Sequence, residues 1–174
     1  MKINYFYFAL PFWTFGVIAA LAAPALADNL LTTHRLSAGL AAEAVTEAVA
    51  VCAKQGYKVT AAIVDTDGVV QALLRGDGAS MVALATASDK AFTVLMLGAA
   101  RNEDSSGAIA ERIGNAPSAG GLAKVEHVLL QPGALRIKVG NEAIAAIGVG
   151  GAPGGNFDEA CAKAGLDKIS DRLR

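Results

Sequence analysis

Residues 147–169 constrain the fold of this chain most strongly, because they combine a strand, a tight loop and a helix start. The stretch reads IGVGGAPGGNFDEACAKAGLDKI. Apolar residues end at a glycine-rich loop over 150–155, and Asn156 is a suitable N-cap for a helix that follows over 157–166. Asp158 and Glu159 fall in its first turn, where negative charge suits the helix dipole. We expect a strand that turns sharply into a helix.

The same loop does not meet the requirements of a phosphate-binding loop. Gly148 and Gly150 begin a spacing that needs a third glycine at position 153, where the chain has Pro153. The lysine of a P-loop is absent, and Asp158 and Glu159 would repel an anion. The glycines therefore indicate a sharp turn with close packing, or a subunit contact.

The rest of the chain alternates helices with paired strands. Asp67-Gly68 and Gly140-Asn141 are strong hairpin signals, so the strands that they join are antiparallel. The expected strands lie at 59–64, 69–74, 125–130, 135–139 and 143–149. The expected helices lie at 36–52, 81–99, 108–113 and 157–166. Thr32 or Thr33 is the expected N-cap of the first helix, and Ser80 is that of the second. This order predicts the α/β (α+β) class, with one antiparallel sheet layered between helices on both faces.

The first 27 residues have the pattern of a secretory signal peptide. Lys2 precedes an apolar run, and Ala25-Leu26-Ala27 is a small-residue cleavage site. An uncleaved anchor is the alternative, because the run is nearly long enough to span a bilayer. We expect cleavage after Ala27, a single domain over 28–174, a periplasmic or secreted location and no stable membrane insertion after cleavage.

The charge of the chain bears on its binding partners, and its cysteines bear on disulfide and metal binding. The formal net charge is −1 and there is no basic stripe, so nucleic acid is not expected as a partner. Cys52 and Cys161 are the two cysteines of the chain. They can form a disulfide in an oxidising compartment, or they can be two small buried apolar residues. They make no zinc pattern.

Four segments of the chain resemble one known family. They are AAIVD at 61–65 with Gly68 and Arg75, DKAFT at 89–93, PGALRI at 132–137, and residues 147–169. Together they are similar to the GlcG/HbpS family, whose haem-degrading domain is related to the C-terminal domain of PduO-type proteins. The similarity extends from about Leu31 to Ile169, and GVGG…DEACAKAGL is its most specific part.

The resemblance implies a profilin-like or PAS-like topology with a five-stranded antiparallel sheet, and homo-oligomers that are commonly octamers. It implies haem as cofactor, with a role in haem capture, buffering or redox sensing. In one branch of the family, the resemblance implies a sensor kinase as partner. The alternative is an enzyme or accessory factor that acts on a small organic acid or a corrinoid. Haem degradation is suggested by the family name, but no catalytic motif is visible and the catalytic residues stay unknown.

Haem needs an axial donor, an apolar slot and cations for its propionates. His34 is the candidate metal ligand, since some family members use a histidine near the N-terminal helix; on a monomer it would face solvent. Lys90, Arg75 and Arg136 are the candidate propionate partners. Lys90 interrupts an apolar helix, so we expect it either to pair with Asp65 or Asp89 or to face a ligand. Arg136 stands where the resemblance implies a proline. His127 is expected to be a partly exposed surface histidine.

Overall fold

The computed structural model describes residues 1–3 and 31–174 of the chain. The predicted signal peptide at 1–27 lies almost wholly outside the described residues. Residues 1–3 have no regular secondary structure, and the second compact unit runs from Thr32 to Arg174.

Within the described part of the chain, the unit has one antiparallel sheet of four strands in the order β2-β1-β4-β3. The strands are β1 (Thr60–Asp65), β2 (Val70–Arg75), β3 (Ala134–Val139) and β4 (Glu142–Gly150). Gly68 and Gly140 lie in the two hairpin turns with φ of 80° and 57°, where a residue without a Cβ is favoured. Both predicted hairpins are confirmed.

The predicted fifth strand at 125–130 is wrong. Residues 125–128 instead form a turn, which a 3.1 Å hydrogen bond from the Val128 amide to the Val125 carbonyl oxygen closes and in which His127 has a φ of 63°. The Leu129 amide then donates a 2.7 Å hydrogen bond to the Thr93 hydroxyl, so that amide is not available to a neighbouring strand. The β-like composition does not correspond to a buried strand here, because Val125 is 53% exposed and only Leu130 of the segment packs against the core. The profilin-like or PAS-like topology with five strands is not confirmed.

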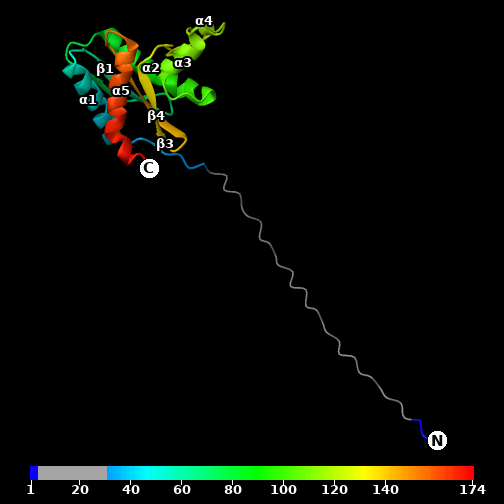
Figure 1. The fold of residues 1–174 in the computed structure, drawn as a ribbon. Helices are drawn as coiled ribbons and strands as arrows, with labels where there is room; N and C mark the ends of the chain where they lie inside the picture. The colour runs from blue at the N-terminus through cyan, green and yellow to red at the C-terminus, as the bar shows by residue number, and fades with distance from the viewer. Residues whose placement is uncertain (4–30) are drawn as a thin grey trace. The chain divides into compact units, whose positions relative to one another are not determined.

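Helices cover both faces of the sheet, as predicted (Figure 1). On one face, α1 (Ala38–Lys54) and α5 (Gly155–Ile169) pack against β1, β2 and β4; on the other, α2 (Met81–Arg101) and α3 (Ser106–Gly114) pack together. The last elements are the short α4 (Ala119–Leu122) and the 3-10 turn η1 (Ser170–Arg172). Each face has its own apolar core, built largely from alanine, valine and isoleucine.

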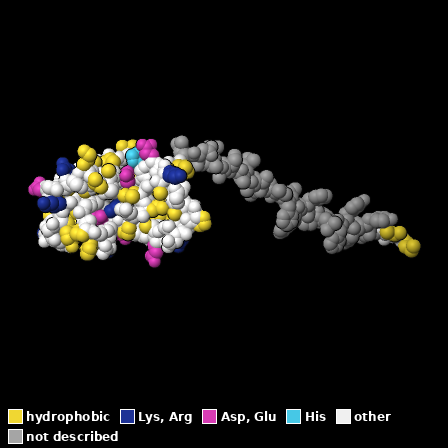
Figure 2. Space-filling view, turned by 90° about the horizontal axis from the view of Figure 1, so that it is seen from above, with side chains coloured by type: hydrophobic (Ala, Val, Ile, Leu, Met, Phe, Trp, Pro, Cys, Tyr) yellow, Lys and Arg dark blue, Asp and Glu magenta, His cyan; other side chains and the backbone are white. Residues whose placement is uncertain are grey.

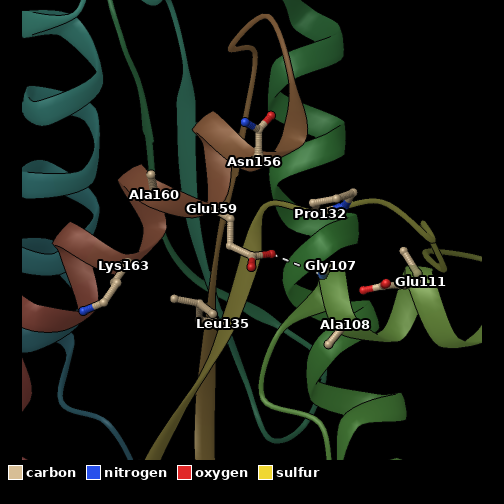
Figure 3. Close-up of a pocket in the computed structure, with 10 residues that line it drawn as sticks. Gly107, Ala108, Glu111, Pro132, Leu135, Asn156, Glu159, Ala160 and Lys163 are labelled. Carbon is tan, nitrogen blue, oxygen red and sulfur yellow. Dashed lines mark hydrogen bonds between the residues drawn. The ribbon is translucent and has the colours of Figure 1, made fainter.

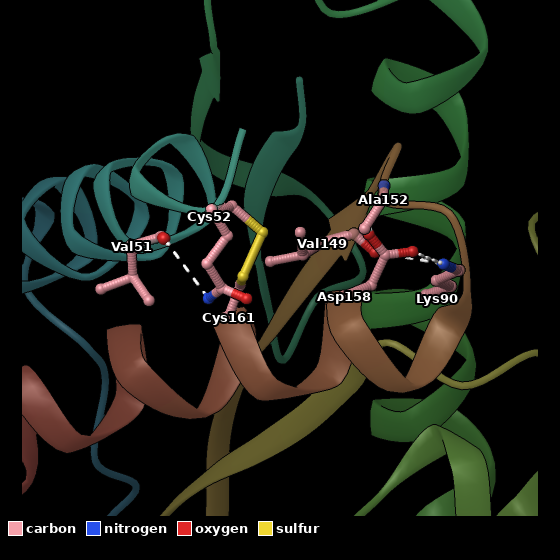
Figure 4. Close-up of a disulfide and its surroundings, with 8 residues drawn as sticks. Val51, Cys52, Lys90, Val149, Ala152, Asp158 and Cys161 are labelled. Carbon is pink, nitrogen blue, oxygen red and sulfur yellow. Dashed lines mark hydrogen bonds and ion pairs between the residues drawn. A yellow bond between two sulfur atoms is a disulfide. The ribbon is translucent and has the colours of Figure 1, made fainter. Parts of the chain in front are cut away.

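A disulfide joins the two helices on the first face. Cys52 of α1 and Cys161 of α5 are bonded, with their Cα atoms 5.8 Å apart, and both are fully buried (Figure 4). The helices approach closely because position 165 is glycine: a Cβ there would lie 2.5 Å from the Ala44 carbonyl oxygen. Of the two alternatives for the cysteines, the structure therefore contains the disulfide.

On the second face, α2 lies directly on the backbone of β4. A Cβ at Gly148 would lie 2.9 Å from the Ala91 nitrogen, and one at Gly150 would lie 2.9 Å from the Ala83 carbonyl oxygen. The glycines of the GVGG motif therefore permit close helix–sheet packing, as the sequence indicated. By length and composition α2 could span a membrane, but nearly half of its apolar stretch is buried within this fold.

Two helix starts differ from the prediction. The cap of α1 is Ser37 instead of Thr32 or Thr33, and its hydroxyl accepts a hydrogen bond from the Leu40 amide, so His34 precedes the helix. The cap of α5 is Gly154 instead of Asn156. Helix α5 also continues past its predicted end at 166, as far as Ile169. The Ser80 cap of α2 is confirmed by a hydrogen bond from the Ala83 amide.

Candidate functional site

The four predicted site residues occupy separate places and do not converge on one pocket. Arg75 closes the loop before α2, where its Nε donates to the Ala79 carbonyl oxygen at 2.7 Å. Arg136 is buried under the end of α2 and donates to Asp104 at 2.7 Å. Neither arginine stands beside His34 or Lys90 in a shared cavity.

Lys90 forms a buried ion pair with an aspartate that was not predicted from the sequence. Its Nζ lies 2.7 Å from Asp158 Oδ2 and 3.2 Å from the Val149 carbonyl oxygen, and both charged side chains are 4% exposed (Figure 4). The predicted partners Asp65 and Asp89 are therefore wrong. Burial raises the pKa of Asp158, while hydrogen bonds from Lys90 and the Ala152 amide oppose that rise. The Lys90 ammonium thus has a counter-ion and a second acceptor inside the fold.

Asp104 accepts hydrogen bonds from two cationic side chains of the edge strand β3, Arg136 and Lys138. Partial burial alone would raise its pKa, but hydrogen bonds from Lys138 and Arg136 outweigh burial and hold the pKa below the ordinary value. Arg136 is thus paired with a local carboxylate that it shares with Lys138. It is not presented to a ligand in this conformation.

His34 lies in the extended segment before α1 and contacts the start of β4. Its Nδ1 is 2.6 Å from Glu142 Oε2, and its backbone amide donates to Glu142 Oε1 at 3.0 Å. These contacts lower the pKa of Glu142. The side chain is 53% exposed. It borders a hollow of about 110 Å³ whose other lining residues include Arg35, Arg172 and Leu173.

A groove of about 740 Å³ lies between α3 and α5. Its floor is mostly apolar, with Pro132 and Leu135 beneath the two helices (Figure 3). Its polar groups are Glu111, Asn156, Glu159 and Lys163. The Lys163 ammonium is engaged by Asp167 at 2.7 Å.

Glu159 points into this groove but is held by the fold. It accepts hydrogen bonds from the Ser105 hydroxyl at 2.7 Å and from the Gly107 and Gly133 amides at 3.1 Å each. One carboxylate of α5 therefore binds the start of α3 and the approach to β3. Together with the Lys90–Asp158 pair, these bonds give both acidic residues of the DEACAKAGL motif a structural role.

Most exposed large apolar side chains of the folded unit gather on α2 and the β1–β2 hairpin. They are Val69, Val70, Leu73, Met81, Val82, Leu84 and Met96. On this side of the sheet the edge strand β2 remains uncovered, because α2 packs over β1, β3 and β4. We call this set the α2–β2 face. Figure 2 shows one face of the folded unit, on which apolar side chains reach the surface in several places between charged ones.

His127, predicted to be a partly exposed surface histidine, is 59% exposed and lies over α2. Its Nδ1 is 3.0 Å from Asp89 Oδ1, and its ring meets that of Phe92 edge to face at 5.7 Å between centroids. Nothing local in the sequence marks this pairing, because 38 positions separate the histidine from the aspartate.

Comparison with known proteins places the chain in a family. The family model described as haem degrading protein HbpS-like matches residues 36–167. The chain belongs to the HbpS-like family. A double mutant of HbpS from Streptomyces reticuli is 29% identical with a TM-score of 0.72, covering 92% of this chain and 97% of that one. The resemblance noted in the sequence is confirmed.

Two further structures extend the comparison. A second HbpS structure is 32% identical, with a TM-score of 0.70 and coverage of 80% and 93% of the two chains. A PduOC:heme complex has a TM-score of 0.69 at 19% identity, over 78% of this chain and 96% of that one, and so shows a shared fold. No curated protein matches the chain.

Proposed function

We propose that this protein binds haem and serves in haem capture, buffering or redox sensing. The observation that carries the proposal is the HbpS-like match over residues 36–167, which spans nearly the whole folded unit. A protein of the same fold has been solved as the PduOC:heme complex, which adds support.

The donor set of the chain suits haem better than a metal cage built by protein alone. Within 1–3 and 31–174, no three histidine, cysteine or acidic side chains are grouped to hold a metal ion. Haem iron needs one or two protein donors, since the porphyrin supplies its other four nitrogens. His34 and His127 each have Nδ1 against a carboxylate, the arrangement that orients an imidazole so that Nε2 can bind a metal.

Export is the second part of the proposal. The signal-peptide pattern at 1–27 directs the mature chain 28–174 to the periplasm or outside the cell. The buried Cys52–Cys161 disulfide supports this, because such bonds persist in oxidising compartments and are rare in the cytosol.

Assembly is the third part. The α2–β2 face is apolar and includes an edge strand, a surface that proteins usually cover. We therefore propose a homo-oligomer, with an octamer as the state that family resemblance implies, and a sensor kinase as a further partner in the redox-sensing role.

The alternative of an enzyme acting on a small organic acid is less well supported. The groove between α3 and α5 is the best place for a small molecule, but Glu111 and Glu159 give it negative charge and Lys163 is engaged by Asp167. An organic acid anion would meet like charge there.

Hemin titration of the mature chain tests haem binding. The proposal expects a shifted Soret band that saturates at a fixed ratio of haem to subunit. Absorbance that rises linearly without saturation, as for hemin in buffer, would overturn it.

A further inference from the structure

We infer that the groove between α3 and α5 binds an organic amine, a small molecule that joins an apolar body to an ammonium group. This site is separate from the haem site of the proposed function and does not depend on it. Haem carries propionate carboxylates, whereas the groove presents carboxylates of its own, and Lys163 at its border is already paired with Asp167.

The groove lies at one edge of the sheet, where a helix from each face reaches the same strand. Leu135 of the edge strand β3 and Pro132 form its floor, while α3 and α5 form its walls (Figure 3). Strand β2, which belongs to the α2–β2 face, is the opposite edge of the sheet. Subunit contacts through the α2–β2 face therefore do not require this groove to be covered.

The groove has the size and the lining of a small-molecule site. Its volume of about 740 Å³ falls within the range of roughly 300–1,000 Å³ that is typical of ligand pockets. Small side chains keep the walls apart: Ala108 and Ala110 of α3 and Ala160 of α5. Together with Pro132 and Leu135 they offer an apolar surface, so the groove can bury the apolar body of a ligand.

Glu111 presents a carboxylate on the α3 wall. The side chain is exposed and points into the groove (Figure 3). Its neighbour Arg112 pairs with Glu103 at 2.7 Å, and no residue in the described part of the chain forms a hydrogen bond or an ion pair with Glu111. An ammonium group in the groove can therefore pair with Glu111 without breaking an existing contact.

Glu159 adds a second negative charge from the α5 wall. Its hydrogen bonds come from neutral donors, the Ser105 hydroxyl and the Gly107 and Gly133 amides, and no cationic side chain among the described residues pairs with it. Neutral donors orient a carboxylate without cancelling its charge. Oε1 accepts only the bond from Ser105, so this oxygen keeps a lone pair for an ammonium group.

The lysine at the border of the groove does not offset these charges. Lys163 binds both carboxylate oxygens of Asp167, at 2.8 and 2.7 Å, and it points away from the groove (Figure 3). Glu111 and Glu159 therefore give the groove a net negative charge over an apolar floor. A cleft lined by charge of one sign attracts ligands of the opposite sign, so an apolar amine fits both properties of the groove.

The test uses three ligands that share a naphthalene ring and differ in charge. Naphthylmethylamine, naphthylmethanol and naphthoate are titrated into the mature chain without hemin near neutral pH, and binding is measured by calorimetry. We expect saturable binding of the amine, at least about fivefold tighter than that of the alcohol, because an ion pair adds to the same apolar contact. Naphthoate should bind most weakly.

Two variants assign this binding to the groove. Glu111→Gln should weaken binding of the amine by about threefold or more and leave that of the alcohol unchanged. Ala160→Phe should fill the groove and abolish binding of both. Ala42→Phe is the matched control, because residue 42 is an exposed alanine of α1, and it should bind both ligands as wild type does. Circular dichroism melting checks that the variants are folded.

Each other outcome overturns the inference or separates it from the proposed function. Absence of saturable amine binding, or equal affinity for all three ligands, would overturn it. Amine binding that Ala160→Phe leaves intact would place the site elsewhere and overturn it as well. Displacement of the amine by hemin would show that haem occupies the groove, against a separate site. A chain that binds the amine but not hemin would overturn the proposed function and support this inference.

Discussion

At the scale of single residues, a buried ion pair connects the two faces of the sheet. Lys90 of α2 and Asp158 of α5 are each 4% exposed, and they join the helices of the two faces through the loop that follows β4. A charge in such a place is costly unless its partner is present.

Lys90→Met should therefore destabilise the protein by about 3–5 kcal/mol, because Asp158 would stay buried without its counter-ion. Urea unfolding followed by circular dichroism measures the loss. The double variant Lys90→Met/Asp158→Leu should recover much of it. A loss below about 1 kcal/mol in the single variant would show that the pair is not needed for stability.

A second residue-scale prediction concerns acid. The pKa of Asp104 is lowered in the folded state, so its contribution to stability is present above its unfolded pKa near 3.8 and is lost as pH falls through the lower folded value. Asp104→Asn should therefore show a smaller loss of unfolding free energy than wild type between about pH 5 and pH 2. Asp77→Asn, which changes an exposed loop residue, is the control. Equal pH dependence in wild type and Asp104→Asn would show that Asp104 has no such linkage.

At the scale of elements, Glu159 connects α5 with α3 and with the loop before β3. Glu159→Gln should destabilise the protein by about 1–3 kcal/mol, because an amide accepts the three donors less well than a carboxylate. Hydrogen exchange at the Gly107 and Gly133 amides should become faster. Glu111→Gln, at the rim of the same groove, should change stability by less than about 0.5 kcal/mol. Similar effects in the two variants would mean that Glu159 has no special role.

The disulfide is the covalent connection between elements. Its cysteines are 109 positions apart, and closing a loop of that length restricts the unfolded chain strongly. Cys52→Ala/Cys161→Ala should therefore lower the unfolding free energy by about 2–5 kcal/mol, and reducing agent should destabilise wild type but not the variant. Two reactive thiols in the denatured, unreduced wild type would show that the bond does not form.

At the scale of the whole molecule, local patterns predicted most of the architecture. Asp67-Gly68 and Gly140-Asn141 specify hairpins through backbone conformation, and Ser80 caps its helix through its own side chain. The predictions failed where residues far apart in the sequence determine the local backbone conformation. The 125–130 segment has strand-like composition, but its Leu129 amide is bound by Thr93 of α2.

The candidate site was harder to predict for the same reason. Lys90 was recognised as a residue that needs a partner, but Asp158 is 68 positions away. Asp89 and Phe92 give His127 its orientation, and only the folded chain brings them beneath it. Sequence patterns identified the family because the GVGG and DEACAKAGL motifs serve packing between neighbouring elements.

Hemin titration tests most directly whether this HbpS-like protein binds haem as an oligomer. The sample is the mature chain, residues 28–174, with its disulfide formed. The Soret band is followed while light scattering reports the mass of the same sample. We expect an oligomer that saturates at a fixed number of haems per subunit. A monomer whose absorbance rises with hemin without saturation would contradict both the proposed ligand and the proposed assembly.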